Sequence, residues 1–211
     1  MKLLLENFKS FITEQEADLP QIYCDMDGVL VDFEQGVVDQ INKDLQMIQS
    51  MADKKNLIKI KNALEQLGRT EIAIEDMRGK SITSKPVRDY MYGRVGNDAN
   101  FWAKLPWMDG GRELWAFIAP YRPHILTSPM QKGSEIGKAF WIDTNLRPLP
   151  AEIYMSHDKY NWALNENGEP NILIDDWSKN TVPWDKAEGI AIQHVDGNTK
   201  ETIRALKKLG F

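Results

Sequence analysis

Two carboxylates lie one residue apart in the stretch Ile22–Phe33, where an apolar run meets a glycine. Asp25 and Asp27 flank Met26, and Gly28 follows directly. An apolar run that ends at a glycine turn is typical of a β-strand, and alternation along extended backbone would let both carboxylates point the same way. A glycine also lets backbone approach a ligand closely. The stretch could hold a metal ion and a phosphate, but a lone D-x-D-G motif also fits a strand with a solvated turn.

Further polar residues follow other predicted strands and decide between these two interpretations. In chain order they are Thr127, Ser128, Lys159, Asp175 and Asp176. The carboxyl ends of parallel strands share one edge of a sheet, where ligands bind in open α/β folds. Carboxylates suit Mg²⁺, which also takes phosphate oxygens and water, while a hydroxyl and an ammonium group would bind the remaining phosphate oxygens. The sequence therefore predicts a metal and phosphate site at this edge.

Strands and helices alternate over the second half of the chain. Apolar patterns predict strands over 124–126, 153–155, 171–174 and 189–195, and helices over 113–118, 134–142, 159–164 and 199–209. This alternation implies a parallel sheet with helices on both faces. We therefore expect an α/β fold.

The segment between the first strand and this alternating region has a different pattern. Residues 34–77 show helical periodicity and no strand, whereas residues 78–100 appear irregular and contain Tyr90, Tyr92 and Arg94. We predict a catalytic core formed by residues 21–33 and 101–211, with residues 34–100 inserted as a small helical cap. Residues 1–20 read as an N-terminal amphipathic helix.

Composition limits the classes of function. The 211 residues carry a net charge of −5, which argues against a partner that is polymeric nucleic acid, because such proteins rely on clustered Lys and Arg. No apolar run approaches the roughly 18 residues of a membrane span, so we expect no membrane partner. Cys24 is the only cysteine, which excludes an intrachain disulfide and favours a cytoplasmic location. The oligomeric state is left open.

The ordered set of motifs resembles a known superfamily. D-x-D-G, T-S, K and D-D occur in the order typical of the haloacid dehalogenase (HAD) superfamily of aspartate-nucleophile phosphatases. Within it, Asp25–Phe33, Leu126–Pro129, Asp158–Lys159 and Ile172–Asp176 resemble the 5′(3′)-deoxyribonucleotidase family, and the likeness covers most of residues 22–194. The resemblance implies a HAD-like Rossmannoid sheet and an Mg²⁺-dependent hydrolase that dephosphorylates (deoxy)nucleoside monophosphates.

The resemblance also implies catalytic roles. Asp25 would attack phosphorus and form an aspartyl phosphate. Asp27 would protonate the leaving oxygen and later deprotonate the attacking water. Lys159 would neutralise the nucleophile and the phosphate, and Thr127 and Ser128 would bind phosphate oxygens.

The same resemblance places the metal and the base. Mg²⁺ would be held by Asp25, Asp175 and the Asp27 carbonyl, with Asp176 supporting the site from outside the coordination sphere. An aromatic base-binding surface is implied at Phe33, and we expect Trp102 to contribute to it.

The chain departs from the family at Ser156–Lys159, where Thr-Arg-Asp-Lys is usual, and at Trp177, where an arginine follows the two acids. These departures leave the substrate open. Alternative functions are a HAD phosphatase for another small phosphomonoester or for a nucleic-acid 3′ phosphate, and a non-catalytic binding module on the same fold.

Overall fold

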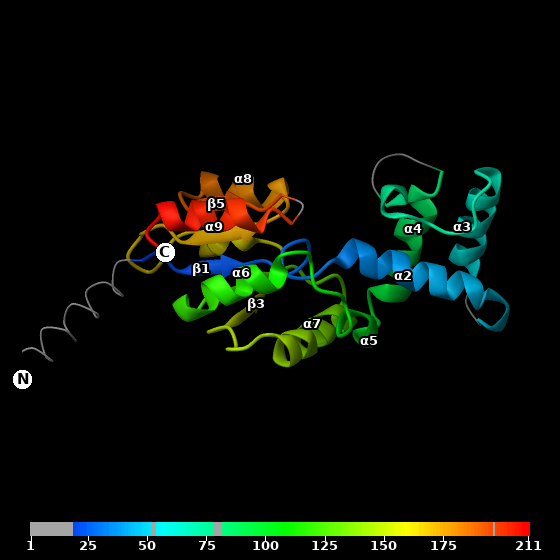
Figure 1. Ribbon diagram of the computed structural model, residues 1–211, viewed down its shortest axis with the longest axis horizontal. Coiled ribbons are helices and arrows are strands. Elements are labelled where there is room, and N and C mark those ends of the chain that lie inside the picture. The colour runs from blue at the N-terminus through cyan, green and yellow to red at the C-terminus, as the bar shows by residue number, and fades with distance from the viewer. Residues whose placement is uncertain (1–18, 52–53, 78–81, 196) are drawn as a thin grey trace, which may run out of the picture.

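A computed structural model describes residues 19–51, 54–77, 82–195 and 197–211. The predicted N-terminal helix lies almost wholly outside these residues. The described chain forms a sheet-containing body and a helical arm that projects from it (Figure 1). Among the described residues, no helix is long and apolar enough to cross a membrane.

Five parallel strands form the sheet in the order β3-β2-β1-β4-β5. Their bounds are β1 Ile22–Cys24, β2 His124–Thr127, β3 Ile153–Met155, β4 Ile172–Asp175 and β5 Ile190–Gln193. In the central pairings Tyr23 lies opposite His124 on one side and Leu173 on the other. The predicted α/β class and every predicted strand are therefore confirmed.

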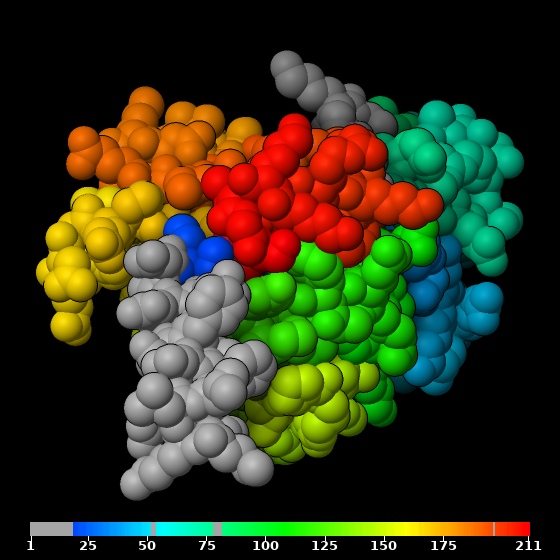
Figure 2. All heavy atoms as spheres, turned by 60° about the vertical axis from the view of Figure 1, so that its left-hand side comes forward, coloured from blue at the N-terminus to red at the C-terminus, as the bar shows by residue number. Residues whose placement is uncertain are grey.

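Helices cover both faces of this sheet, and the central strands β1 and β4 are accordingly buried along their whole length. The helices α6 (Gly111–Ile118), α7 (Lys132–Asn145) and α9 (Thr199–Lys208) contribute to the larger core, together with the strand residues that share the face of Ile22. On the opposite face, Tyr23 packs with residues of the 3₁₀ turn η5 (Lys159–Trp162) and of α8 (Ser178–Lys186). Figure 2 shows α9 in red, between the green surface around α6 and the orange surface of α8.

The described part of the inserted segment consists of helices joined by turns and contains no strand. Its elements are α2 Phe33–Gln46, η1 Ile48–Ser50, α3 Lys55–Gln66, η2 Ile74–Asp76, α4 Ser84–Tyr90 and the π-helical turn η3 Met91–Val95. The expectation of an irregular segment over residues 78–100 was wrong for its described part. Pro86 does not break this region, because it lies in the first turn of α4, where backbone N–H groups need no helical partner.

Two chain segments connect the insertion to the sheet, and they are tied to each other. The outgoing segment follows β1, and the return segment contains α5 (Ala99–Trp102). The N–H of Asp32 donates to Pro106 O at 3.0 Å, and the N–H of Met108 donates to Leu30 O at 2.9 Å. Both connections therefore leave the sheet beside the end of β1.

Candidate active site

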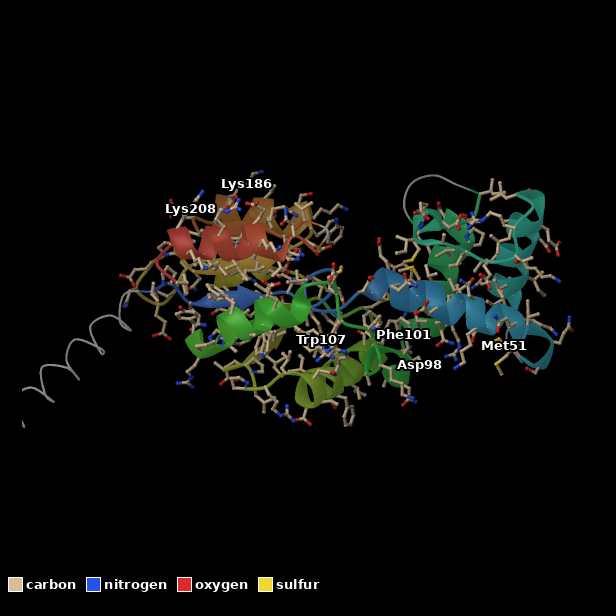
Figure 3. All side chains as sticks on the ribbon, viewed as in Figure 1. Met51, Asp98, Phe101, Trp107, Lys186 and Lys208 are labelled. Carbon is tan, nitrogen blue, oxygen red and sulfur yellow. The ribbon has the colours of Figure 1, made fainter. Side chains whose placement is uncertain are left out.

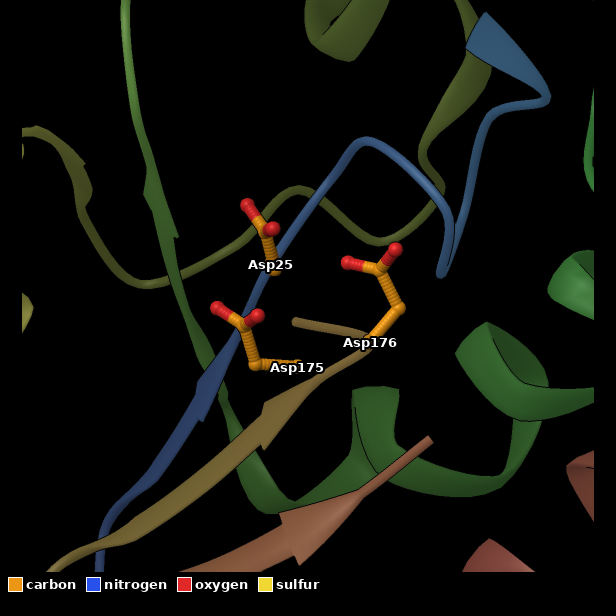
Figure 4. Close-up of side chains that lie close together, drawn as sticks. All are labelled: Asp25, Asp175 and Asp176. Carbon is orange, nitrogen blue, oxygen red and sulfur yellow. The ribbon is translucent and has the colours of Figure 1, made fainter. Parts of the chain in front are cut away.

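Three carboxylates meet at the carboxyl edge of the sheet. Asp25 follows β1, Asp175 is the last residue of β4, and Asp176 comes next. They can offer oxygen atoms that all lie within 4.8 Å of one another (Figure 4). Asp25 and Asp175 are buried, and the neighbouring parallel strands that carry them explain why residues 150 positions apart in the chain meet here.

A tight turn begins at Met26, between Asp25 and Asp27, and leaves space for the three-carboxylate group. Strand β1 ends at Cys24, and the N–H groups of Leu30 and Val31 both donate to Met26 O. Gly28 has φ +72°, and a Cβ there would lie 2.3 Å from an Asp176 carboxylate oxygen. Asp25 still pairs with β4, because its N–H donates to Ile174 O at 2.8 Å, whereas the turn places Asp27. The glycine is required so that Asp176 can approach.

Lys159 connects the two buried carboxylates. Its Nζ lies 2.8 Å from Asp25 Oδ1 and donates to Asp175 Oδ2 at 2.7 Å. Burial by itself would lower the pKa of Lys159, but the charges of Asp25 and Asp175 outweigh burial and raise it. The group is therefore an ammonium cation, as its predicted role requires.

A second buried lysine, which the sequence did not reveal, holds Asp27. Lys138 of α7 donates to Asp27 Oδ2 at 2.6 Å, to Thr127 Oγ1 at 2.8 Å and to Ser128 O at 2.7 Å. The signal that could have identified it is its place on the buried face of α7 beside Trp141 and Ile142, since lysine is almost never fully buried without a partner.

The hydrogen bond from Lys138 gives Asp27 a different environment from that of the three-carboxylate group. Its own burial raises its pKa, the charge of Lys138 acts in the opposite direction, and the charge of Asp25 raises it further. A carboxyl with a raised pKa that retains a cation at one oxygen can both release and accept a proton.

The two hydroxyl groups predicted to bind phosphate differ in whether they already donate their proton within the protein. Thr127 is fully buried and accepts from Lys138, which leaves its hydroxyl proton to donate to a ligand. Ser128 donates its hydroxyl to Ser156 O at 3.0 Å. Ser128 would have to give up that bond to donate to phosphate.

Asp175 is held by α8 as well as by Lys159. The backbone N–H of Trp177 donates to Asp175 Oδ1 at 2.9 Å, and Asn180 Nδ2 lies 3.1 and 3.0 Å from its two oxygens. Asn180 was not predicted from the sequence. These contacts fix the carboxylate in the direction of Asp25.

The acidic group fits a divalent cation. Burial raises the pKa of Asp175 to about 6, and the charge of Asp25 contributes. The surrounding protein desolvates the Asp176 carboxyl and, together with three neighbouring carboxylates, raises its pKa to about 8, although the residue is exposed overall. A cation that takes oxygen ligands would relieve this repulsion. The geometry makes Asp176 a candidate ligand in its own right, whereas we expected it only outside the coordination sphere.

These raised pKa values predict how stability depends on pH and Mg²⁺. Because both lie above the ordinary value of 3.8, the folded metal-free protein binds more protons than the unfolded chain between that pH and about 8. Its stability should therefore fall as the pH rises through this window, and Mg²⁺ should stabilise it more at about pH 8 than at about pH 5. Thermal unfolding with and without Mg²⁺ measures both effects.

The matched variant for this prediction is Asp176→Asn. It should be more stable than the wild type at about pH 8 without Mg²⁺, and the difference should shrink towards pH 4. A wild-type advantage at pH 8 in metal-free buffer would contradict the proposed repulsion.

The two predicted base-binding rings pack on each other. Phe33 and Trp102 are stacked with ring centres 5.0 Å apart and an interplanar angle of 14°. Trp102 is 1% exposed, its Nε1 donates to Val95 O, and Lys138 Nζ lies 5.0 Å from its ring centre. Phe33 is partly exposed. In this conformation only Phe33 could stack on a ligand, and Trp102 supports it from behind.

Comparison with known proteins identifies the fold. No protein-family model matches the chain, and no curated protein matches its sequence. Among solved structures, YfnB from Bacillus subtilis, described as a HAD-hydrolase and bound to magnesium, aligns with a TM-score of 0.52 and 13% identity over 90% of this chain and 99% of YfnB. A hydrolase from Streptococcus pneumoniae TIGR4 aligns with a TM-score of 0.52 and 12% identity over 90% of this chain and 98% of its own. The chain therefore has a HAD-like fold.

Proposed function

We propose that this HAD-like protein is an Mg²⁺-dependent phosphomonoesterase that acts through an aspartyl phosphate, and that its substrates are (deoxy)nucleoside monophosphates, as in a 5′(3′)-deoxyribonucleotidase. One observation carries the proposal: the two carboxylates of the D-x-D motif have separate partners. Asp25 lies in the acidic group with Lys159, whereas Asp27 is paired with Lys138. A nucleophile and a proton donor need this difference in environment.

The first step follows from these contacts. A carboxylate oxygen of Asp25 attacks phosphorus while the bond from phosphorus to the leaving oxygen breaks. Asp27 gives its proton to that oxygen and becomes a carboxylate stabilised by Lys138. Lys159 and the Thr127 hydroxyl neutralise and orient phosphate oxygens.

The second step uses the same groups in reverse. Asp27 takes a proton from water, and the resulting hydroxide attacks phosphorus, which releases phosphate and restores the Asp25 carboxylate. Bound through Asp25, Asp175 and the Asp27 carbonyl or Asp176, Mg²⁺ would supply positive charge to phosphate oxygens during both steps.

We also propose that residues 34–100 act as a cap over the site. Both connections of this insertion leave the sheet beside β1, and Phe33 and Trp102 meet there. A substrate that reaches Asp25 from the side of the insertion would pass Phe33. The net charge of −5 supports a small-molecule substrate rather than a nucleic-acid polymer.

The test is a panel of phosphomonoesters with and without Mg²⁺. We expect deoxynucleoside monophosphates to be hydrolysed faster than sugar phosphates or oligonucleotide 3′ phosphates. Activity should fall to background in excess EDTA, because Asp25 and Asp175 would then repel both each other and the phosphate. Undiminished turnover in EDTA after gel filtration would contradict the metal requirement. Absence of all turnover, p-nitrophenyl phosphate included, would favour the binding-module alternative.

Phe33→Ala tests base recognition. Stacking on an aromatic ring is worth on the order of 1 to 3 kcal/mol per base, so the KM for deoxynucleoside monophosphates should rise about 5- to 150-fold. The KM for p-nitrophenyl phosphate, which has no base, should change much less. Both constants come from initial-rate measurements on each substrate.

Phe140→Ala is the matched control, because Phe140 is 62% exposed and lies on the opposite side of α7 from Lys138. Its constants should match the wild type. If Phe33→Ala weakened both substrates equally in a folded protein, the ring would only brace the connection, and base recognition would have to lie around Tyr90, Tyr92 and Arg94.

A further inference from the structure

A hollow lies where the insertion joins the core. We call it the neck pocket. It has a volume of about 350 Å³, and its walls come from α2, from Arg94 of η3 and from the return segment. The residues that matter for its chemistry are Lys43, Arg94, Asp98, Phe101, Lys104 and Pro106. Figure 3 labels Asp98 and Phe101 at this junction, beside α2. The volume lies within the roughly 300–1,000 Å³ range of small-molecule sites.

The charged groups of the neck pocket leave two cations free. Arg94 is neutralised by Asp98, whose carboxylate lies 2.6 Å from the guanidinium and also accepts the N–H groups of Asn100 and Phe101. Its Nε lies 3.9 Å from the carboxylate of Asp44, which is not part of the lining. No carboxylate of the described residues lies within ion-pair distance of Lys43 or Lys104.

One acid remains on the rim of the pocket. Asp39 is exposed and accepts a hydrogen bond from Gln35 Nε2 at 2.7 Å. The lining therefore carries three cations and two carboxylates in a protein whose net charge is −5. Its chemistry favours an anion.

The remaining wall is apolar. Gly36 of α2 lies against the return segment, and a Cβ there would come within 2.4 Å of Leu105 Cδ2 and 3.7 Å of the Phe101 ring. Phe101, Leu105 and Pro106 all line the pocket. An anion that also has an apolar or aromatic part would use both kinds of wall.

The neck pocket is separate from the catalytic group. None of its lining residues belongs to the three-carboxylate group or to the lysine pairs of that site. The contact between them is indirect: the Phe101 ring meets Trp102 edge-on at 5.5 Å, and Trp102 faces Lys138.

We infer that the neck pocket is a second binding site, for a small organic anion with at least two negative charges. Lys43 of α2 contacts it from the insertion, and Lys104 contacts it from the return segment. Such a ligand joins α2 to the return segment and holds them at one separation. The binding step is independent of the proposed function, and only an effect on turnover would depend on it.

The experiment measures pyrophosphate binding by calorimetry in EDTA. Without a metal, the three catalytic carboxylates repel anions, and Lys138 and Lys159 are already paired. We expect one saturable site in the wild type. The double variant Lys43→Gln/Lys104→Gln should raise the Kd by roughly tenfold or more, since each lysine loses a charge-assisted contact. ATP should bind more tightly than pyrophosphate, because its base and sugar add apolar contact.

The matched control is Lys186→Gln/Lys208→Gln. It removes the same charge from exposed lysines of α8 and α9, which Figure 3 labels on the core. This variant should bind as the wild type does. Amide hydrogen exchange should also show that pyrophosphate protects residues 33–46 and 98–106.

Three results would overturn the inference. They are the absence of saturable binding in the wild type, equal weakening in both double variants, and loss of binding on Lys138→Met with none on Lys43→Gln/Lys104→Gln. The last result would assign the anion to the catalytic site. Because Lys43 and Lys104 are exposed, their replacement leaves the core intact, and thermal unfolding verifies this.

Discussion

Asp25→Asn should abolish phosphomonoester turnover and leave a folded protein. Asparagine keeps the shape of the side chain but cannot form the aspartyl phosphate, so kcat should fall by on the order of 10⁶, as when other enzymes lose a nucleophile. Asp25 is 5% exposed and lies beside Asp175 and Asp176, so removal of its charge also relieves repulsion in the metal-free protein. Phosphate release and thermal unfolding measure the two effects.

The control for this prediction is nucleotide binding to the inactive variant. Asp25→Asn should still bind a deoxynucleoside monophosphate when Mg²⁺ is present, because Lys159 and Thr127 remain. Appreciable turnover in a preparation free of wild-type enzyme would show that Asp25 is not the nucleophile.

Asp27→Asn should lower kcat for nucleoside monophosphates by roughly 10² to 10⁴, the range of general acid–base catalysis. It removes the proton donor of the first step and the base of the second. With p-nitrophenyl phosphate the leaving group scarcely needs a proton. Rapid mixing should therefore show a burst of p-nitrophenolate, about one per enzyme, followed by slow turnover.

Lys138→Met separates the role of Asp27 from that of its partner. Without the ammonium group, burial raises the pKa of Asp27 further, so the alkaline limb of the pH–rate profile, where Asp27 loses the proton it must donate, should move to higher pH. Asp27→Asn should lose that limb. If Lys138→Met lowered activity but left the pH–rate profile unchanged, Lys138 would act only on Thr127 and the phosphate.

Much of the fold could be predicted because its signals are local. Short apolar runs such as 153–155, and the amphipathic pattern of 199–209, identify a strand and a helix without knowledge of their neighbours. Residues 84–95 escaped prediction because Pro86 and Gly93 suggest breaks. Packing of Val87 and Tyr90 in the core outweighs these weak local preferences.

The site was harder to predict where it depends on contacts between distant elements. Asp25 and Asp175 could be found because each lies at the carboxyl end of a strand, and parallel strand ends converge. Lys138 lies in mid-helix, and nothing local shows that α7 turns it towards Asp27, 111 residues away in the chain. The stack of Phe33 on Trp102 likewise exists only once both connections meet.

The position of β1 in the centre of the sheet has a consequence for how the protein folds. Its neighbours β2 and β4 begin 102 and 150 residues later, counted from Ile22 to His124 and to Ile172. At synthesis rates of roughly 5 to 20 residues per second, the nucleophile strand has no neighbours on either side for about 5 to 20 seconds, and its second partner arrives about 8 to 30 seconds after it. The helical insertion is translated within that interval. We therefore expect helices to form first during translation, and the catalytic edge to be among the last parts of the molecule to assemble.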